Sequence, residues 1–474
     1  MATKTRTKTK REEAPREHKK SWQETCATVE EIKAMVSERV LLRYNEVRRR
    51  TEVHWLSEGP VIQEDEQGLL TIFGAEGTVT DGYRNLGDRD INTLWGELCK
   101  EKFVVKQHLQ NIIDSDFVPH YHPFRHYLEH LPPWKQEDGD NILLLAMSVN
   151  VKAPFKREKN DACIGSSERE VARPEVKGDA DEQILFYQYL KKWLVAMVAS
   201  WVNPTVVNNV MLVLIGAQGS YKTTWFSHLL PPQLREYFYT KTNSGMVSKD
   251  DLLVLAQYGL VCWEELDSML PKELNKLKAA MTMPSINERG AYERYHENRP
   301  HVASFCGTGN NVQFLSDTTG TRRWLPFEVE SIESPLTTPF DYDGIYAQAY
   351  ALYQQGFQYW FSSEEIQQLT QHNRQFETPC LEQELICQYF RRPAEREPGE
   401  FMAVSLALQI VGANITQKIN SVMLGRAFRE LGFKDHKSHG IRGYIVVRRS
   451  PEEMRSMRYQ MAQGADGADG AQSF

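Results

Sequence analysis

A lysine and a threonine stand next to each other in "GAQGSYKTTW", residues 216–225. The stretch matches the phosphate-binding pattern G-x-x-x-x-G-K-[ST] at Gly216, Lys222 and Thr223, whereas Tyr221 replaces the second glycine. In such a loop the backbone N–H groups surround phosphates, the lysine reaches the terminal phosphates and the threonine hydroxyl binds Mg²⁺. We therefore expect ATP with Mg²⁺ to contact Gly216, Ala217, Gln218, Gly219, Ser220, Tyr221, Lys222, Thr223 and Thr224. The alternative is a chance surface loop in front of a helix.

Two adjacent carboxylates follow an apolar run in "GLVCWEELD", residues 259–267. ATP hydrolysis needs one carboxylate near Mg²⁺ and another to position or deprotonate the attacking water. We assign the metal role, together with Thr223, to Glu264 and the water role to Glu265. The alternative is that these acids only mark the exit of a strand into solvent.

Polar residues also follow a third apolar run, "HVASFCGTGNN" (301–311), and the adjoining "SDTTGTRRWLPFEV". Asn310 is expected to hold the attacking water between the carboxyl ends of the other two strands. Arg322 or Arg323 is expected to reach the γ-phosphate of a neighbouring subunit as an arginine finger. Surface arginines that flank a buried Trp324 are the alternative.

Basic and aromatic residues alternate between the second and third runs. Lys278 is expected on a helix, and Arg289, Tyr292 and Arg294 in a hairpin around Gly290. Cations that meet phosphates and rings that stack on bases suit a single-stranded nucleic acid. An ordinary solvated hairpin is the alternative, because acids are interspersed.

These residues need a common scaffold. The apolar runs 210–215, 259–263 and 301–309 read as strands of an open parallel sheet, which binds ligands at the carboxyl ends of its strands. A helix starting near Lys222 would aim its positive N-terminus at phosphate oxygens. Gly219 can take a positive φ at the turn, and we expect Tyr221 to adopt ordinary helical angles. The fold class predicted for this part is α/β.

The rest of the chain divides by composition. We expect a disordered basic arm (1–21), a mostly helical domain (22–150) that includes a helix over "EEIKAMVSERVLLRYNEVRRR", and a polar linker (151–182). The ATPase domain (183–335) begins with a buried helix, "ILFYQYLKKWLVAMVASWV". A helical connector (336–380), a compact C-terminal domain (381–450) and a disordered tail (451–474) follow.

Length and charge narrow the protein class. A chain of 474 residues exceeds one ordinary domain, and the net charge of −7 argues weakly against nonspecific coating of DNA. No run reaches the ~20 apolar residues of a membrane span, so we expect no membrane partner. The seven cysteines are scattered without a C-x-x-C pair, which predicts neither a zinc site nor a disulfide framework but a reduced, cytoplasmic protein.

The last unit contains "NSVMLGRAFRELGFKDHKSHGIRGYIVVRRS". A helix, a stop at Gly432, a basic loop and a strand are expected there, which is how a winged helix ends. Residues 426–449 carry seven Lys or Arg against two acids. Winged helices place a helix in the major groove or mediate protein contacts, and both roles stay open here.

The ordered set of "GAQGSYKTTW", "CWEEL", Lys278, "GTGN" and "TGTRRWLPF" resembles the virulence-associated protein E family of P-loop ATPases. It also resembles superfamily 3 helicases, within the wider AAA+ group. "SDFVPHYHPFRHYLEHLPPW" is similar to the family's upstream region, so the resemblance covers about residues 40–330. The C-terminal unit resembles a domain of unknown function on mobile-element members from Bacteroides.

The resemblance implies an AAA+-like ATPase that forms a ring, hexameric in such relatives, and moves on single-stranded or forked DNA. A primase or another replication protein is an implied partner. Carried onto this chain, Lys222 and Thr223 are Walker A, Glu264 and Glu265 Walker B, and Asn310 sensor 1. Lys278 falls where superfamily 3 members have a basic residue facing the DNA channel. Tyr221 in place of glycine and Glu264 in place of aspartate depart from the pattern, which puts the catalytic rate in doubt.

The residues described above are compatible with three functional hypotheses. The first is a DNA-dependent motor in replication or maintenance of a mobile element or phage. The second is a nucleotide-dependent switch or assembly ATPase, for example in phage defence, that does not unwind DNA. The third, a small-molecule kinase, is disfavoured because no acceptor-binding lid is apparent and because of the arginine pair.

Overall fold

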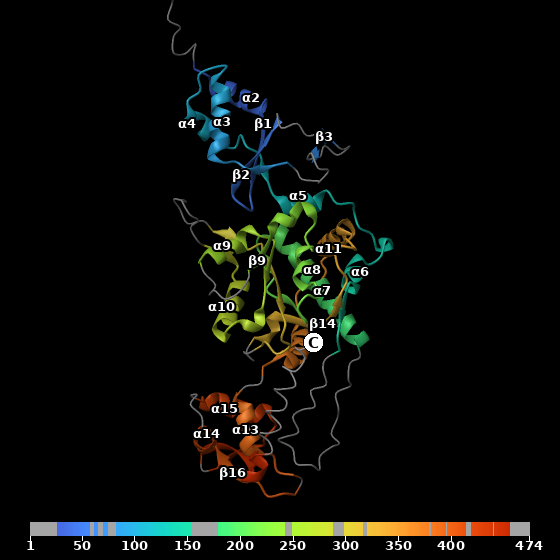
Figure 1. The fold of residues 1–474 in the computed structure, drawn as a ribbon, viewed down its shortest axis with the longest axis vertical. Coiled ribbons are helices and arrows are strands. Elements are labelled where there is room, and N and C mark those ends of the chain that lie inside the picture. Colours follow the sequence, from blue (N-terminus) through green and yellow to red (C-terminus); the bar gives the residue numbers. More distant parts are fainter. Residues whose placement is uncertain are drawn as a thin grey trace, which may run out of the picture. The chain divides into compact units, whose positions relative to one another are not determined.

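The computed structural model describes residues 26–56, 61–64, 70–73, 82–153, 179–241, 249–287, 298–315, 320–378, 381–394, 396–413, 419–438 and 440–455. The chain forms two compact units. One consists of Met1–Glu129 with Pro232–Leu234, and the other of His130–Pro231 with Arg235–Phe474. Figure 1 shows the elements of both.

The first unit combines helices with a four-stranded sheet. The helix expected over 30–50 ends early, as α2 (Val29–Ser37), and the strands β1 (Val40–Asn45) and β2 (Arg50–Trp55) follow as an antiparallel hairpin. Val53 and Trp55 of β2 join the hydrophobic core of this unit, and the polar residues Glu52 and His54 between them are buried as well. The sheet order is β5-β2-β1-β6, with β5 at Arg84–Asn85 and β6 at His120–Tyr121.

Three helices complete this unit: α3 (Asp88–Cys99), α4 (Lys106–Ile113) and α5 (Pro123–Glu129). Leu94, Leu98, Leu109 and Ile113 of α3 and α4 share one core with α2 and the hairpin. A separate pair of strands, β3 (Val61–Glu64) and β4 (Leu70–Phe73), is antiparallel.

The second unit is built on a six-stranded sheet with the order β7-β14-β8-β13-β10-β9. The strands are β7 (Val149–Val151), β14 (Trp324–Ile332), β8 (Met211–Ile215), β13 (Ser304–Gly309), β10 (Leu260–Trp263) and β9 (Phe238–Lys241). Only β7 is antiparallel to its neighbour; the other pairings are parallel. The three strands predicted around the nucleotide are therefore adjacent, with β13 in the middle.

Both faces of this sheet are covered, as its uniformly apolar strands require. Met211, Val213 and Ile215 share a core with Leu255 of α9 (Lys249–Gln257) and Leu277 of α10 (Pro271–Met281). The predicted buried helix is α7 (Asp179–Val202). The indole of its Trp193 donates to the carbonyl of Phe305 at 3.0 Å, and that of Trp201 to the carbonyl of Gly259 at 3.1 Å.

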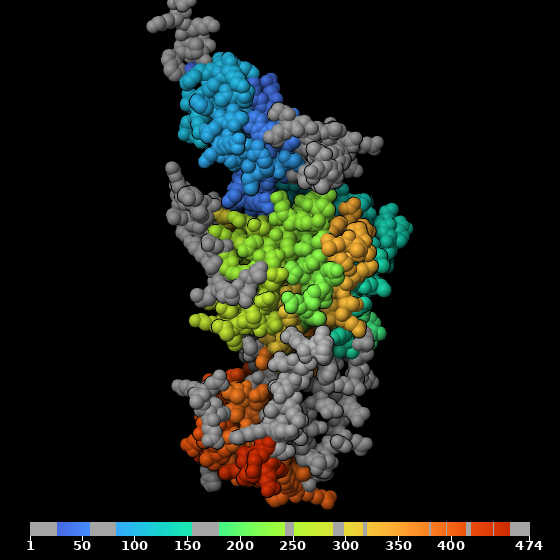
Figure 2. All heavy atoms as spheres, in the orientation of Figure 1, coloured from blue at the N-terminus to red at the C-terminus, as the bar shows by residue number. Residues whose placement is uncertain are grey.

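Shorter elements surround the sheet. They are α6 (Asn141–Met147), α8 (Lys222–Ser227), α11 (Tyr342–Gln354), α12 (Ser363–Asn373), and the small pair β11 (Ser285–Ile286) and β12 (Arg299–Pro300). In the space-filling view the green to yellow atoms of this part form a continuous surface (Figure 2). No helix among the described residues is long and apolar enough to cross a membrane.

The C-terminal part has its own core around Phe428, Tyr444 and Val446. Its elements are α13 (Leu381–Tyr389), β15 (Phe390–Arg391), β16 (Glu400–Ala403), α14 (Val404–Gly412), α15 (Ser421–Glu430), β17 (Asp435–Ser438) and β18 (Ile441–Arg448). β18 pairs with β16 and β17 in antiparallel fashion. α15 ends before Gly432, whose φ is 76°, so the stop that the sequence indicates is where a left-handed residue is needed.

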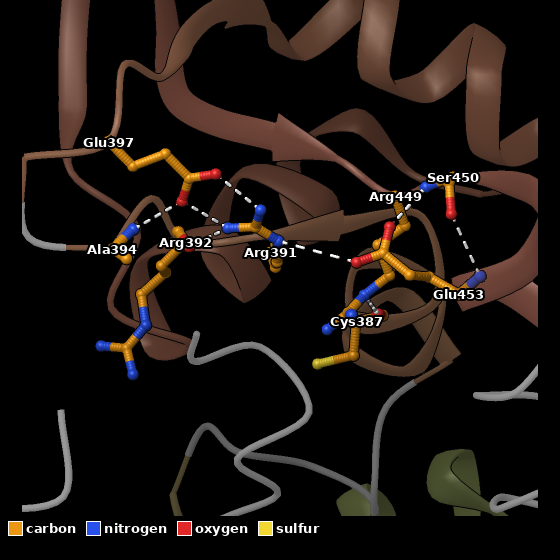
Figure 3. Close-up of polar contacts among 8 residues, drawn as sticks. All are labelled: Cys387, Arg391, Arg392, Ala394, Glu397, Arg449, Ser450 and Glu453. Atoms are coloured by element: carbon orange, nitrogen blue, oxygen red, sulfur yellow. Dashed lines mark hydrogen bonds and ion pairs between the residues drawn. The ribbon is translucent and has the colours of Figure 1, made fainter. Parts of the chain in front are cut away.

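Arg391 lies in β15, which pairs with the C-terminal end of β18 (Figure 3). Its guanidinium binds both carboxylate oxygens of Glu397 at 2.6 Å and lies 4.0 Å from Glu453. The bidentate pairing with Arg391 lowers the pKa of Glu397 to about 2. The nearby Cys387 is disulfide-bonded, so the expectation that all cysteines are reduced is wrong for this residue.

Candidate nucleotide-binding site

The predicted site residues gather at one edge of the large sheet. β8, β10 and β13 run parallel, so their carboxyl ends point to the same edge. The loop 216–221 follows β8, the acids Glu264 and Glu265 follow β10, and Asn310 follows β13. Because β13 lies between the other two strands, Asn310 stands between the loop and the acids.

The loop 216–221 contains two residues in the left-handed region. Gly219 has φ 83°, as the sequence predicted. Tyr221 has φ 60° and ψ 14° and precedes α8, so the expectation of ordinary helical angles at Tyr221 is wrong. The glycine of the common pattern would take this backbone conformation without strain, and Tyr221 adopts it with its side chain 46% exposed.

Lys222 lies inside the loop that it follows, with only 7% of the residue exposed. Its Nζ donates to the carbonyls of Gly216 at 2.8 Å and Ala217 at 2.7 Å, and to Ser220 Oγ at 3.2 Å. Asn310 Oδ1 is a fourth acceptor, at 3.5 Å. Burial lowers the pKa of Lys222, and the charge of Asp267 opposes that shift. The lysine is thus held at the point where phosphate oxygens would meet the loop.

Thr223 and Glu264 connect the loop to the strand β10. Thr223 Oγ1 donates to Glu264 Oε1 at 2.9 Å. Magnesium prefers oxygen ligands and is usually bound through one or two carboxylates together with substrate phosphates and waters. A hydroxyl and a carboxylate brought to this distance, beside a loop suited to phosphates, therefore fit a nucleotide-bound Mg²⁺.

Glu265 starts a tight turn that folds back over β13. It is exposed and has φ 53°, and the 3₁₀ turn Leu266–Ser268 follows. A Cβ at Gly307 would overlap Leu266, and one at Gly309 would lie 3.2 Å from Asp267 Oδ1. The two glycines of "GTGN" therefore make room for this turn.

Asp267 is a site residue to which the sequence reasoning gave no role. Its carboxylate accepts the backbone N–H of Asn310 at 3.3 Å and of Asn311 at 3.1 Å. It thereby fixes the loop that carries Asn310 to the turn that carries Glu265. Two features of the sequence could have indicated it: Asp267 stands a few residues after the apolar run 259–263, and the next apolar run contains glycines at alternate positions, Gly307 and Gly309.

Arg322 and Arg323 belong to a 3₁₀ turn, Thr321–Arg323, anchored by Asn373. Asn373 Nδ2 donates to the carbonyls of Thr321 at 2.7 Å and Trp324 at 2.9 Å. Arg322 is exposed and Arg323 is half-buried. Burial, and secondly the charge of Arg322, lower the pKa of Arg323. The turn is firmly held at its base, while the finger role remains a prediction.

Lys278 lies on α10 as predicted, but only 6% of the residue is exposed. It approaches Arg323 near Gly320: a Cβ there would lie 3.3 Å from Arg323 Nη1 and 3.9 Å from Lys278 Nζ. A cation buried in this way does not offer the exposed charge that we expected to face DNA. Arg289, Tyr292 and Arg294 lie outside the described residues, so the predicted hairpin is not tested.

Comparison with known proteins adds a family match. No curated protein matches the chain. Three solved apo structures of the C-terminal region of NrS-1 are distantly similar: 12% identity with a TM-score of 0.41, 10% with 0.41, and 11% with 0.42. Each match covers 88% of this chain and 98% of the other, and scores this low carry no argument about fold or function. Residues 175–378 match the family model of the virulence-associated protein E-like domain, which supports the relation that the sequence motifs indicated.

Proposed function

We propose that the chain is a Mg²⁺-dependent ATPase whose turnover is coupled to DNA. The observation that carries the proposal is the 2.9 Å hydrogen bond from Thr223 to Glu264, which joins the phosphate loop to the acidic end of β10. Chance would rarely bring a G-x-x-x-x-x-K-T loop and a carboxylate from a separate strand to this distance.

Each side chain has a distinct task in the proposed reaction. Lys222 binds the terminal phosphates, exchanging its bonds to the loop carbonyls for phosphate oxygens. Thr223 and Glu264 hold Mg²⁺, which neutralises charge on the phosphates when bound. Glu265 orients the attacking water, and Asn310 contacts it from the middle strand.

Completion of the site requires a second copy of the chain in this proposal. Arg322 or Arg323 from a neighbouring subunit stabilises the charge that develops on the γ-phosphate. The exposure of Arg322 on an anchored turn supports an outward reach. The assembly is a homo-oligomeric ring, and its substrate is single-stranded or forked DNA of a replicating mobile element.

The decisive experiment compares ATP binding with turnover in purified full-length protein. Glu265→Gln should retain ATP affinity and lose at least about 100-fold in kcat, the scale of general-base catalysis. Lys222→Ala should lose nucleotide binding itself. Glu364→Gln, an exposed acid on α12, is the control and should match the wild type. Wild-type turnover in Glu265→Gln would refute the assignment of the water role.

A strand-displacement assay on forked DNA separates a motor from a nucleotide-dependent switch. The motor displaces a strand only with ATP and Mg²⁺, and Glu265→Gln abolishes displacement. Turnover without displacement would favour the switch or assembly ATPase, since both functions use the same catalytic residues.

A further inference from the structure

The outer face of α15 has no covering element among the described residues. Leu424, Ala427 and Phe428 point into the core, where Phe428 stacks on Tyr444 with 4.8 Å between ring centroids. On the other side, Val422 is 74% exposed and Met423 36% exposed. One side of α15 therefore packs into the core, and the side that carries Val422 and Met423 is exposed to solvent.

The strand β18 contacts α15, because the hydroxyl of Tyr444 donates to the carbonyl of Gly425 at 2.6 Å. The β17–β18 hairpin that contains this strand carries positive charge. Lys437 and Arg442 are cross-strand partners, and both are exposed, as is Lys434 at the start of the hairpin. Arg442 lies 3.7 Å from Asp435, an exposed pair of the kind that contributes little stability. Arg442 is therefore able to exchange this weak pair for contact with another anionic partner.

Several cations of this surface have no acidic partner. In the described part of the chain, Arg429, Lys434 and Lys437 form no ion pair, whereas Arg426 binds Glu430 at 2.7 Å. Residues 426–449 carry seven Lys or Arg against two acids, in a protein whose net charge is −7. Local positive charge on a negative protein points to an anionic partner rather than to general solubility.

We propose that this surface docks double-stranded DNA, with α15 in the major groove and the β17–β18 hairpin on the phosphate backbone. The ten residues of α15 span ~15 Å, and a major groove ~12 Å wide admits one helix. Val422 and Met423 would meet base edges such as thymine methyl groups, while Arg429, Lys434 and Lys437 neutralise phosphates. The site is separate from the proposed nucleotide site and does not depend on it.

The test is binding of a labelled DNA duplex to the full-length protein without nucleotide, followed by fluorescence anisotropy over a range of salt concentrations. In the variant Arg429→Ala/Lys434→Ala/Lys437→Ala, three phosphate contacts are lost. The slope of log affinity against log salt should become shallower by roughly 2.7, which is three times 0.9. At about 0.1 M salt this corresponds to a loss of up to roughly 500-fold in affinity.

Two further variants show whether a loss of binding comes from the lost contacts rather than from a defect in folding. Lys272→Ala/Arg396→Ala/Arg455→Ala removes equal charge from exposed cations outside α15 and the β17–β18 hairpin, and it should bind duplex like the wild type. Val422→Asp puts a negative charge in the first turn of α15, where it favours the helix but repels phosphates. It should weaken binding without lowering Tm.

The outcomes are distinct. A loss of affinity confined to the α15 and hairpin variants, with basal ATPase unchanged, supports the proposal. No duplex binding by the wild type at low salt, an unchanged salt slope in the triple variant, or binding of single strands alone would each overturn it. ATPase activity is measured separately, so a failure of the nucleotide site leaves this result interpretable.

Discussion

Tyr221 allows a direct test of backbone strain in the phosphate loop. A side chain in the left-handed region costs roughly 1–2 kcal/mol, which glycine avoids. Glycine also gains freedom in the unfolded chain, which lowers stability by about 0.4–1 kcal/mol relative to alanine. At φ 60° the strain is the larger effect, so Tyr221→Gly should exceed Tyr221→Ala in stability by roughly 0.5–1 kcal/mol.

The comparison of these two variants cancels the contacts of the tyrosine ring, because both variants lack the ring. Asn275, exposed on α10, supplies the control pair. There, Asn275→Gly should be less stable than Asn275→Ala by roughly 0.5–1 kcal/mol, since helix interiors disfavour glycine.

Calorimetry or urea unfolding measures both pairs. A difference of this size shifts Tm by roughly 1–4 °C in a unit of this length. The strain argument predicts opposite signs at the two positions. If Tyr221→Ala proved equal to or more stable than Tyr221→Gly, the left-handed backbone at Tyr221 would be refuted as the reason for glycine in the common pattern.

Other residues give separate tests. Asp267→Asn should lower kcat roughly tenfold, about 1.4 kcal/mol, with KM for ATP little changed, because it frees the loop of Asn310 but leaves the phosphate loop; a matching fall in ATP affinity would contradict this. Mixing an Arg323→Ala subunit with a Lys222→Ala subunit should restore part of the turnover if the finger acts in trans, and turnover of a monomer at every concentration would contradict it. Since the pKa of Glu397 is lowered to about 2, the stability it contributes is present above its unfolded pKa near 4.3 and is lost as the pH falls toward 2. Glu397→Gln should flatten urea-unfolding stability over this range, while an unchanged pH profile would rule the pair out.

The sequence predicted the strands β8, β10 and β13 and the polar residues that follow them. Val213 and Leu214 lie in a continuous apolar run, and the polar residues after each run mark the carboxyl ends of the strands. The position of Asn310 between the other two strands was expected, but the order of all six strands could not be read from the sequence. It depends on long-range packing, such as the fit of Leu266 over Gly307, which no local pattern expresses.

Sequence patterns did not predict the structure where the same residues suit either a helix or a strand, or where burial depends on distant residues. The segment 40–55 contains residues that suit a helix, yet it pairs as the hairpin β1–β2, and Val53 and Trp55 pack into the core of the unit. Lys278 has helical spacing and a basic side chain, and only the tertiary fold shows that it is buried. Burial depends on neighbours distant in sequence, such as Gly320.

The bonds of Lys222 suggest how a nucleotide could be sensed at a distance. A lysine that turns toward phosphate releases the carbonyls of Gly216 and Ala217, and it also releases the side chain of Asn310. Asn310 is tied through its backbone to Asp267, and therefore to the turn that begins at Glu265. In the proposed ATPase, this chain of contacts couples the arrival of the phosphates to the orientation of the attacking water.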